Sequence, residues 1–346
     1  MTTTPTATDR KGPLIIAEIS GNHNGSLERA LEIVRAVAAA GAHAVKIQTY
    51  TADTITLDVD APAFRVSEGH ELWGSRTLHD LYEEAHTPWE WHAPIFALAR
   101  ELGMLAFSTP FDETAVDFLE TLDVPLYKIA SLEIVDLPLI KQVAQTGKPV
   151  ILSVGTASIA EVAAAVDAAR AGGCTDLTLL ACTSSYPAQP DDANLRRIPV
   201  MAELFGTKVG LSDHTLGTGV SVAATALGAT VIEKHVTLRR ADGGVDSAFS
   251  LEPEELKQLV DGCDAAARAL GSASEWASAA ESESLRLRPS LYISADVKAG
   301  DVATSANVRS VRPGGGLPPV DLDRVLGRTF GADAALGTPV AWELFS

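Results

Sequence analysis

Three kinds of residue are scarce in this chain of 346 residues. Aromatic residues make up 5% of it, so a buried core must be built mainly from aliphatic side chains. The 3 cysteines are an odd number without a CxxC pair, which argues against a disulfide framework and a cysteine-rich zinc site. Lys and Arg number 27 against 45 Asp and Glu, and the net charge of -18 disfavours nucleic acid and anionic membranes as partners.

Long apolar runs are also missing. No stretch approaches the roughly 20 apolar residues of a membrane span, and residues 1–12 lack the apolar region of a signal peptide. We therefore expect a soluble, cytoplasmic protein. Apolar residues still amount to 46%, which is enough for a sizeable core, and the length fits one large and one small domain or a single elaborated barrel.

Short apolar runs alternate with longer, alanine-rich amphipathic stretches. Eight strands are predicted, at residues 14–19, 44–49, 104–109, 126–131, 149–154, 177–182, 208–212 and 230–235. Helices are predicted at residues 27–40, 81–102, 114–122, 159–171, 217–227 and 253–270. Buried strands alternating with helices predict a (β/α)8 TIM barrel, with a doubly wound open sheet as the main alternative.

The pattern changes after the last of these helices. We predict a disordered N-terminus at residues 1–12, a catalytic barrel at 13–271, a linker at 272–288 and a second domain at 289–346. The linker begins with a small and polar stretch that could also be an exposed helix. The second domain consists of short strand-like pieces broken by glycine and proline. So small a unit has a thin core, and we expect it to lean on the barrel or on another subunit.

Polar residues gather where the predicted strands end, which is the catalytic edge of a TIM barrel. Helix capping is an equally good explanation for Ser153, Ser184 and Asp213. It does not explain Lys46, Lys128 and Lys234, because each is a cation inside an apolar run, where an unpaired charge is costly to bury. A site that binds anions explains at least two of these lysines.

Two histidines end the seventh and eighth strands, which are neighbours in a barrel. Either His214 or His235 alone is typical of a hydrogen-bonded core residue, but together with Glu18 on the adjacent first strand they predict a site for Mn²⁺, Zn²⁺ or Fe²⁺. Asp246 follows in a glycine-containing loop. We expect the loop to be followed by a helix that is capped through Ser250 and begins at Glu252-Pro253, and its glycines could also bring Asp246 over the barrel mouth.

Eight segments in order along the chain carry a family resemblance: IIAEISGNHNGSLERALEIV, AVKIQTYTADTITLD, STPFDETAVDFLE, YKIASLEI, KPVILSVGTAS, CTSSYPA, VGLSDHTLG and VIEKHVTL. From about residue 14 to the end, the chain resembles the sialic acid synthases, which condense phosphoenolpyruvate with an N-acetylated amino sugar. Within that family, LHDLYEEAHTPWEWH, GGVDSAFSLEP and RSVRPGGGLPP are most similar to the pseudaminic acid synthases, whose sugar is 2,4-diacetamido-2,4,6-trideoxy-L-altrose. The resemblance implies an antifreeze-protein-like (SAF) domain at the C-terminus.

The resemblance also implies a role for each candidate residue. It implies that Mn²⁺ binds to His214 and His235, and that Glu18 contacts the sugar or a metal-bound water. Phosphoenolpyruvate would lie among Lys46, Lys128, Thr109, Ser131, Ser153 and Ser184, and Ser212 would be a further substrate-binding residue. Glu133 and Tyr186 would contact the substrates, and Asp246 the sugar. Arg312 of the small domain would hold an N-acetyl group of the other subunit's sugar in a domain-swapped homodimer.

Other functions remain open at this point. The sugar could instead be that of an N-acetylneuraminate or legionaminate synthase. More distant alternatives are a lysine aldolase that uses Lys128 as a Schiff base and a sugar-binding barrel without catalysis.

Overall fold

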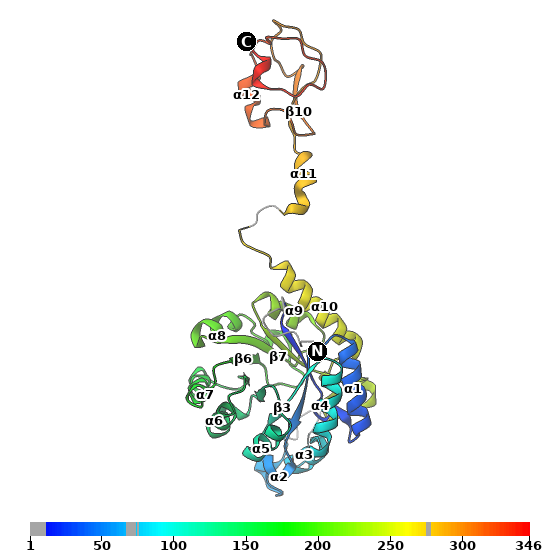
Figure 1. Cartoon of the computed structure of the whole chain (residues 1–346), viewed down its shortest axis with the longest axis vertical. Helices are drawn as coiled ribbons and strands as arrows, with labels where there is room; N and C mark the ends of the chain where they lie inside the picture. The colour runs from blue at the N-terminus through cyan, green and yellow to red at the C-terminus, as the bar shows by residue number, and fades with distance from the viewer. Residues whose placement is uncertain (1–11, 67–73, 75, 275–277) are drawn as a thin grey trace. The chain divides into compact units, whose positions relative to one another are not determined.

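In the computed structural model, which describes residues 12–66, 74, 76–274 and 278–346, eight parallel strands close into a barrel in their order along the chain (Figure 1). The strands are β1 Leu14–Glu18, β2 Ala44–Thr49, β3 Leu105–Pro110, β4 Tyr127–Ile129, β5 Val150–Ser153, β6 Leu177–Cys182, β7 Lys208–Asp213 and β8 Val231–His235. The predicted TIM barrel is confirmed, and each predicted strand overlaps an observed one.

Helices surround the barrel: α1 Leu27–Ala39, α4 His92–Glu101, α5 Glu113–Thr121, α6 Leu137–Gln145, α7 Ile159–Ala171, α8 Arg197–Phe205, α9 Gly219–Ala226 and α10 Pro253–Ala269. Two short helices, α2 Ala52–Ile55 and α3 Leu78–Ala85, lie in the long connection between β2 and β3. Side chains of Ser26, Asp112 and Asp136 accept hydrogen bonds from first-turn amides and so fix where α1, α5 and α6 begin.

Two predictions about the helices were wrong. The single helix predicted at residues 81–102 is interrupted between α3 and α4, because Pro88 has no amide hydrogen to continue the helical hydrogen bonds. Ser250 does not cap α10. Glu252 is the N-cap. Its carboxylate accepts a hydrogen bond from the backbone amide of Glu255, and the Glu255 carboxylate accepts one from the backbone amide of Glu252, which together form a capping box.

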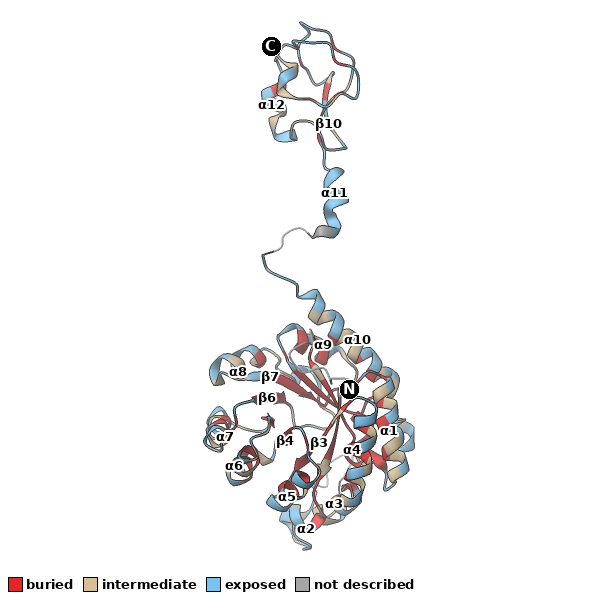
Figure 2. Ribbon diagram, in the orientation of Figure 1, coloured by how far each residue is buried: buried red, intermediate tan, exposed pale blue. Residues whose placement is uncertain are grey.

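The core lies in two layers, inside the barrel and between the strands and the helices. Figure 2 shows the strands buried along nearly their whole length, with the outer faces of the helices exposed. Ile16, Ile47, Phe107 and Ile232 are completely buried. Because the strands are covered on both sides, their sequences are nearly continuous in apolar residues and the few polar ones stand out.

Strand register brings the polar residues of the C-terminal ends together. Glu18 on β1 lies level with Lys46 on β2 and with His235 on β8. Ser212 on β7 lies level with Glu233 on β8. Residues far apart in the sequence are thereby fixed side by side at one edge of the barrel.

The chain divides into two compact units, residues 1–270 and 271–346. The second unit has an antiparallel pair, β9 Ser290–Ile293 and β10 Val308–Val311, and two short helices, α11 Ser282–Arg286 and α12 Leu322–Val325. Its small core includes Leu291, Val308, Phe330 and Val340. Of the N-terminus predicted to be disordered, residues 1–11 lie outside the described residues. Within the described part, no helix is both long and apolar enough to cross a bilayer.

Candidate active site

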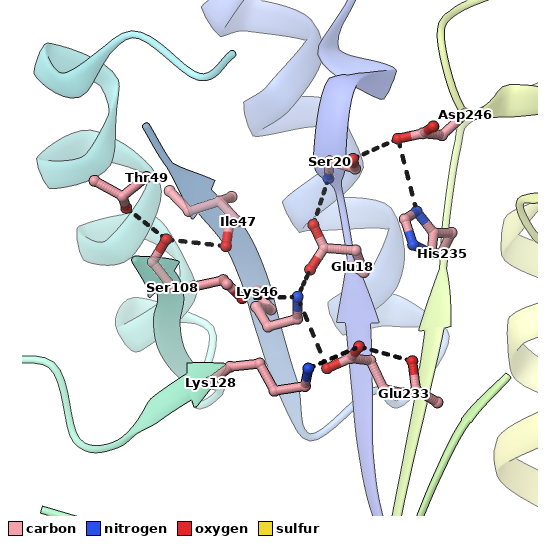
Figure 3. Close-up of polar contacts among 12 residues, drawn as sticks. Glu18, Ser20, Lys46, Ile47, Thr49, Ser108, Lys128, Glu233, His235 and Asp246 are labelled. Carbon is pink, nitrogen blue, oxygen red and sulfur yellow. Dashed lines mark hydrogen bonds and ion pairs between the residues drawn. The ribbon is translucent and has the colours of Figure 1, made fainter. Parts of the chain in front are cut away.

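Four charged side chains form a buried cluster at the C-terminal end of the barrel (Figure 3). Lys46 Nζ contacts Glu18 Oε2 and lies 3.8 Å from Glu233 Oε2, and Lys128 Nζ lies 3.9 Å from Glu233 Oε1. All four side chains are at most 5% exposed. Two cations balance two carboxylates, so the charges can be buried because each one has an opposite neighbour.

Burial and the charges within the cluster also shift the pKa values of its members. Burial raises the pKa of Glu18 to about 7, although the ammonium group of Lys46 opposes the rise. Burial lowers the pKa of Lys46, but the carboxylates of Glu18 and Glu233 outweigh it, and the pKa is raised overall. Near neutral pH, Glu18 can therefore gain or lose a proton while Lys46 stays charged, which suits Glu18 to acid–base catalysis.

Hydroxyl groups lie at or just after the ends of neighbouring strands, and one of them contacts a lysine. Lys46 Nζ donates to Thr109 Oγ1 at 3.2 Å. Ser131, after β4, and Ser184, after β6, have their Oγ atoms 2.8 Å apart. Ser153 at the end of β5 is buried, and its Oγ has no hydrogen-bond partner among the described residues. A buried hydroxyl without a partner is costly, and an anionic ligand beside the two ammonium groups would supply one.

The two predicted metal ligands face each other. The ring centroids of His214 and His235 are 5.4 Å apart. His214 Nδ1 lies 3.0 Å from the carbonyl oxygen of Thr183 and must donate to it, so Nε2 is the ring nitrogen that could bind a metal. Burial lowers the pKa of His214, but Cys182 and the Thr183 carbonyl outweigh burial and raise the pKa overall, so a metal at Nε2 would compete with a proton. Burial and the positive charges of neighbouring groups lower the pKa of His235, so its ring is neutral, as a ligand must be.

The donor set fits an ion with open positions. In the part of the chain that the structure describes, no three His, Cys, Asp or Glu side chains converge closely enough to enclose a metal. The buried His235 Nδ1 has no hydrogen-bond partner among those residues and lies 3.9 Å from Asp246 Oδ2. Two imidazoles with a carboxylate close by suit a divalent ion that takes its other ligands from water and substrate.

Asp246 is held over the barrel by a residue that the sequence analysis missed. Ser20 Oγ donates to Asp246 Oδ2, and the Ser20 amide donates to Glu18 Oε1 at 2.8 Å (Figure 3). The φ of Ser20 is 48°, in the left-handed region that serine rarely adopts, and such conformations persist mainly where the site requires them. Ser250 Oγ donates to the Asp246 carbonyl at 2.7 Å, so Ser250 fixes this loop. Only the position of Ser20, just after Glu18, could have drawn attention to it.

The remaining predicted residues divide between the two units. The ring of Tyr186 lies 4.5 Å from that of His214, and Ser212 Oγ donates to Glu233 Oε1 at 3.1 Å. Glu133 follows β4, and burial raises its pKa. Arg312 is exposed and follows β10 in the second unit.

Lys234 is not part of this site. Its Nζ lies 3.0 Å from Asp213 Oδ2, with both side chains at most 1% exposed, and it donates to the Thr215 carbonyl. Because alternate residues of a strand face opposite sides, Lys234 points away from the side of Glu233 and His235. The anion site therefore uses two of the three candidate lysines.

Two family models match this chain, NeuB family over residues 33–275 and SAF domain over residues 288–346. The chain belongs to the NeuB family. The predicted resemblance and the predicted SAF domain are thus confirmed. Within the family, the pseudaminic acid synthase of Helicobacter pylori is 41% identical over 330 residues, covering 95% of this chain and 96% of that protein. The N,N'-diacetyllegionaminic acid synthase of Legionella pneumophila is 36% identical, covering 95% and 93%.

A solved structure agrees with the family assignment. The crystal structure of the N-acetylneuraminic acid synthetase from Leptospira borgpetersenii, in complex with citrate, is 33% identical with a TM-score of 0.69. The match covers 80% of this chain and 91% of that one.

Proposed function

We propose that this NeuB-family protein is a pseudaminic acid synthase. It would join phosphoenolpyruvate, 2,4-diacetamido-2,4,6-trideoxy-L-altrose and water to give pseudaminate and phosphate. The observation that carries the proposal is that two buried lysines, the paired hydroxyls of Ser131 and Ser184 and two neighbouring imidazoles all lie at the C-terminal ends of the strands of one barrel. The 41% identity to a named pseudaminic acid synthase supports the choice of sugar.

Phosphoenolpyruvate carries close to three negative charges, and the chain as a whole is acidic, with a net charge of -18. Attraction must therefore come from local groups. Lys46 and Lys128 supply positive charge, and hydrogen bonds would come from hydroxyls of Thr109, Ser131, Ser153 and Ser184, while Ser212 donates its hydroxyl proton to Glu233.

His214 and His235 would hold a divalent metal, with Mn²⁺ as the expected ion. When bound, such an ion acts as a Lewis acid on the carbonyl oxygen of the open-chain sugar. Asp246, fixed by Ser20, would orient the sugar beside His235. Tyr186, which packs on His214, would close the same side.

The chain's own carboxylates account for the proton transfers. The enol carbon of phosphoenolpyruvate bonds to the aldehyde carbon, whose oxygen takes the proton of Glu18 and becomes a hydroxyl, and positive charge develops on the carbon that carries the phosphate. Glu233, which lies 3.9 Å from Lys128, and Glu133 would stabilise that charge. The ionised Glu18 then accepts a proton from the water that adds there, and the new hydroxyl gives its proton to the phosphate, which leaves by cleavage of its bond to carbon.

We further propose that the protein acts in the cytoplasm as a domain-swapped homodimer in which Arg312 serves the partner's sugar. Four large apolar side chains in the segments that follow the strands are more than half exposed: Leu132, Val135, Leu216 and, at the start of α7, Ile159. Exposed apolar residues around a barrel mouth suit a surface that another subunit covers. The small core of the second unit also favours packing against a larger body.

A phosphate-release assay with phosphoenolpyruvate, Mn²⁺ and a panel of acetamido sugars tests the proposal. We expect the highest kcat/KM with the 2,4-diacetamido-6-deoxy sugar and loss of activity with EDTA. A higher kcat/KM with N-acetylmannosamine or the legionaminate precursor would reassign the sugar. Trapping of a covalent adduct by borohydride and pyruvate would favour a lysine aldolase instead.

A further inference from the structure

Gly155 lies two residues beyond the last residue of β5, between two of the serines in the candidate phosphate site. A Cβ atom built on Gly155 would lie 2.1 Å from Ser184 Oγ, 2.9 Å from Ser131 Cβ and 3.1 Å from Ser131 Oγ. The φ of Gly155 is outside the left-handed region, so its backbone conformation is open to other residues. Glycine is needed here for the space that a side chain would take.

Other glycines of the barrel differ in this respect. Gly25, Gly147 and Gly173 have positive φ angles of 69°, 73° and 100°, and a Cβ on any of them would meet nothing within 4 Å. They serve turns, where backbone conformation demands glycine. Gly155 differs in both respects. Its φ is not positive, and the space that a Cβ atom would occupy is taken by atoms of Ser131 and Ser184.

The two serines could not both adjust to a side chain at this position. Ser184 Oγ could rotate away, but that rotation would break its 2.8 Å contact with Ser131 Oγ. Ser131 Cβ is attached directly to the backbone, and rotation of its side chain leaves it where it is. Any added methyl group therefore displaces the hydroxyl pair of Ser131 and Ser184. Ser153, two residues before Gly155, has a buried Oγ without a protein partner among the described residues.

We infer that Gly155 is a positioning residue for the phosphate group of phosphoenolpyruvate. Because glycine has no side chain, the hydroxyls of Ser131 and Ser184 can lie in contact with each other against the backbone of Gly155. In that position they and the hydroxyl of Ser153 would bind one anion. The inference rests on the proposed function, since it names which part of that substrate the glycine serves.

The experiment is a double-mutant cycle on Gly155→Ala and Ser184→Ala. Gly155→Ala should raise the KM for phosphoenolpyruvate by about tenfold or more, as expected for loss of hydrogen bonds to a charged group, and should leave the KM for the sugar nearly unchanged. In the Ser184→Ala background the same change should cost clearly less than in the wild type, because the approach to Ser184 Oγ is gone and only the approaches to Ser131 Cβ at 2.9 Å and Ser131 Oγ at 3.1 Å remain. Calorimetric titration with phosphoenolpyruvate should show the same non-additivity.

Two glycines provide matched controls. Gly219→Ala adds a methyl group where nothing lies within 4 Å, and both KM values should stay as they are. Gly172→Ala, at the C-terminal end of α7, creates close approaches of 2.6 Å to Ala144 Cβ and 2.8 Å to the Lys141 carbonyl, outside the site. It should lower the melting temperature without changing the KM for phosphoenolpyruvate.

The outcomes separate this inference from the proposed function. A wild-type enzyme that neither binds phosphoenolpyruvate nor releases phosphate would defeat the proposed function itself. An active wild type with an unchanged KM in Gly155→Ala, or with additive effects in the cycle, would overturn the inference alone. Failure of Gly155→Ala to fold, seen by circular dichroism, would also overturn it, since the glycine would then serve folding.

Discussion

His235 is the residue on which the metal assignment depends most directly. Its ring is buried, neutral and faces His214, with 5.4 Å between the ring centroids. We predict that His235→Ala abolishes both Mn²⁺ binding and phosphate release, because one imidazole retains little of the affinity of two. Calorimetric titration with Mn²⁺ measures the first effect, and circular dichroism should show an intact fold. Unchanged Mn²⁺ affinity would remove His235 from the site.

His92 should make folding sensitive to acid. Its Nε2 lies 2.8 Å from Thr49 Oγ1, and burial lowers its pKa to about 4, from 6.5 in the unfolded chain. Between these two values the unfolded state binds more protons, so stability is full above pH 6.5 and falls as the pH drops towards 4. At pH 5 this histidine should cost about 2 kcal/mol relative to pH 7.

Urea unfolding of wild type and His92→Gln at the two pH values measures that contribution. Glutamine is uncharged throughout, so the variant should lose less stability between pH 7 and pH 5 than the wild type does. Equal losses in the two proteins would show that His92 is not the titrating group.

Single residues also show how far the sequence alone could predict the site. Lys46, Lys128, His214 and His235 were predictable because each breaks an apolar strand or ends one, and burial of a polar group there demands a reason. Ser20 was not, since its role comes from a left-handed turn that places its hydroxyl on Asp246, 226 residues away.

At the scale of elements, the two faces of β8 take part in different buried ion pairs. Glu233 and His235 share one face of the strand, and Lys234 lies on the other with Asp213. Lys234→Met leaves the Asp213 carboxylate buried without a counter-charge, which should cost about 3–5 kcal/mol of stability. Thermal unfolding should show this loss, while the KM for phosphoenolpyruvate of the folded variant stays near that of the wild type.

Lys46→Met is the matched comparison on β2. Glu18, with a pKa of about 7, can take up a proton when its ammonium neighbour is removed, and the loss of stability should be smaller. Phosphate release should nevertheless fall by several orders of magnitude, because the substrate loses a charged partner. If the two variants showed the same pattern of stability and activity, the distinction between the faces of the barrel wall would be wrong.

The elements themselves followed from periodicity to different degrees. All eight strands were predicted because strands covered on both sides are apolar throughout. Helices α6 and α8 were missed: Leu137–Gln145 and Arg197–Phe205 are short and each carries an internal proline in its first turns. Proline is tolerated in the first turn of a helix because the amides of that turn have no helical hydrogen-bond partners. A proline at such a position therefore does not argue against a helix.

At the scale of the whole molecule, the second unit poses the main functional question. Residues 271–346 form a separate compact unit, and their candidate site residue, Arg312, is exposed. In the proposed domain swap, that arginine would contact the sugar bound to the partner's barrel. Under it, each active site contains the barrel of one chain and the small domain of the other.

Subunit mixing tests this arrangement. Glu18→Ala damages the barrel half of a site and Arg312→Ala the small-domain half, so each homodimer should be nearly inactive. In a swapped dimer that carries one of each, both lesions fall in the same site and the other site is intact. Random pairing of equal amounts makes half of the dimers mixed, so roughly a quarter of wild-type activity should return. If exchange is confirmed by mass spectrometry and activity stays at the average of the parents, Arg312 does not serve the partner's sugar.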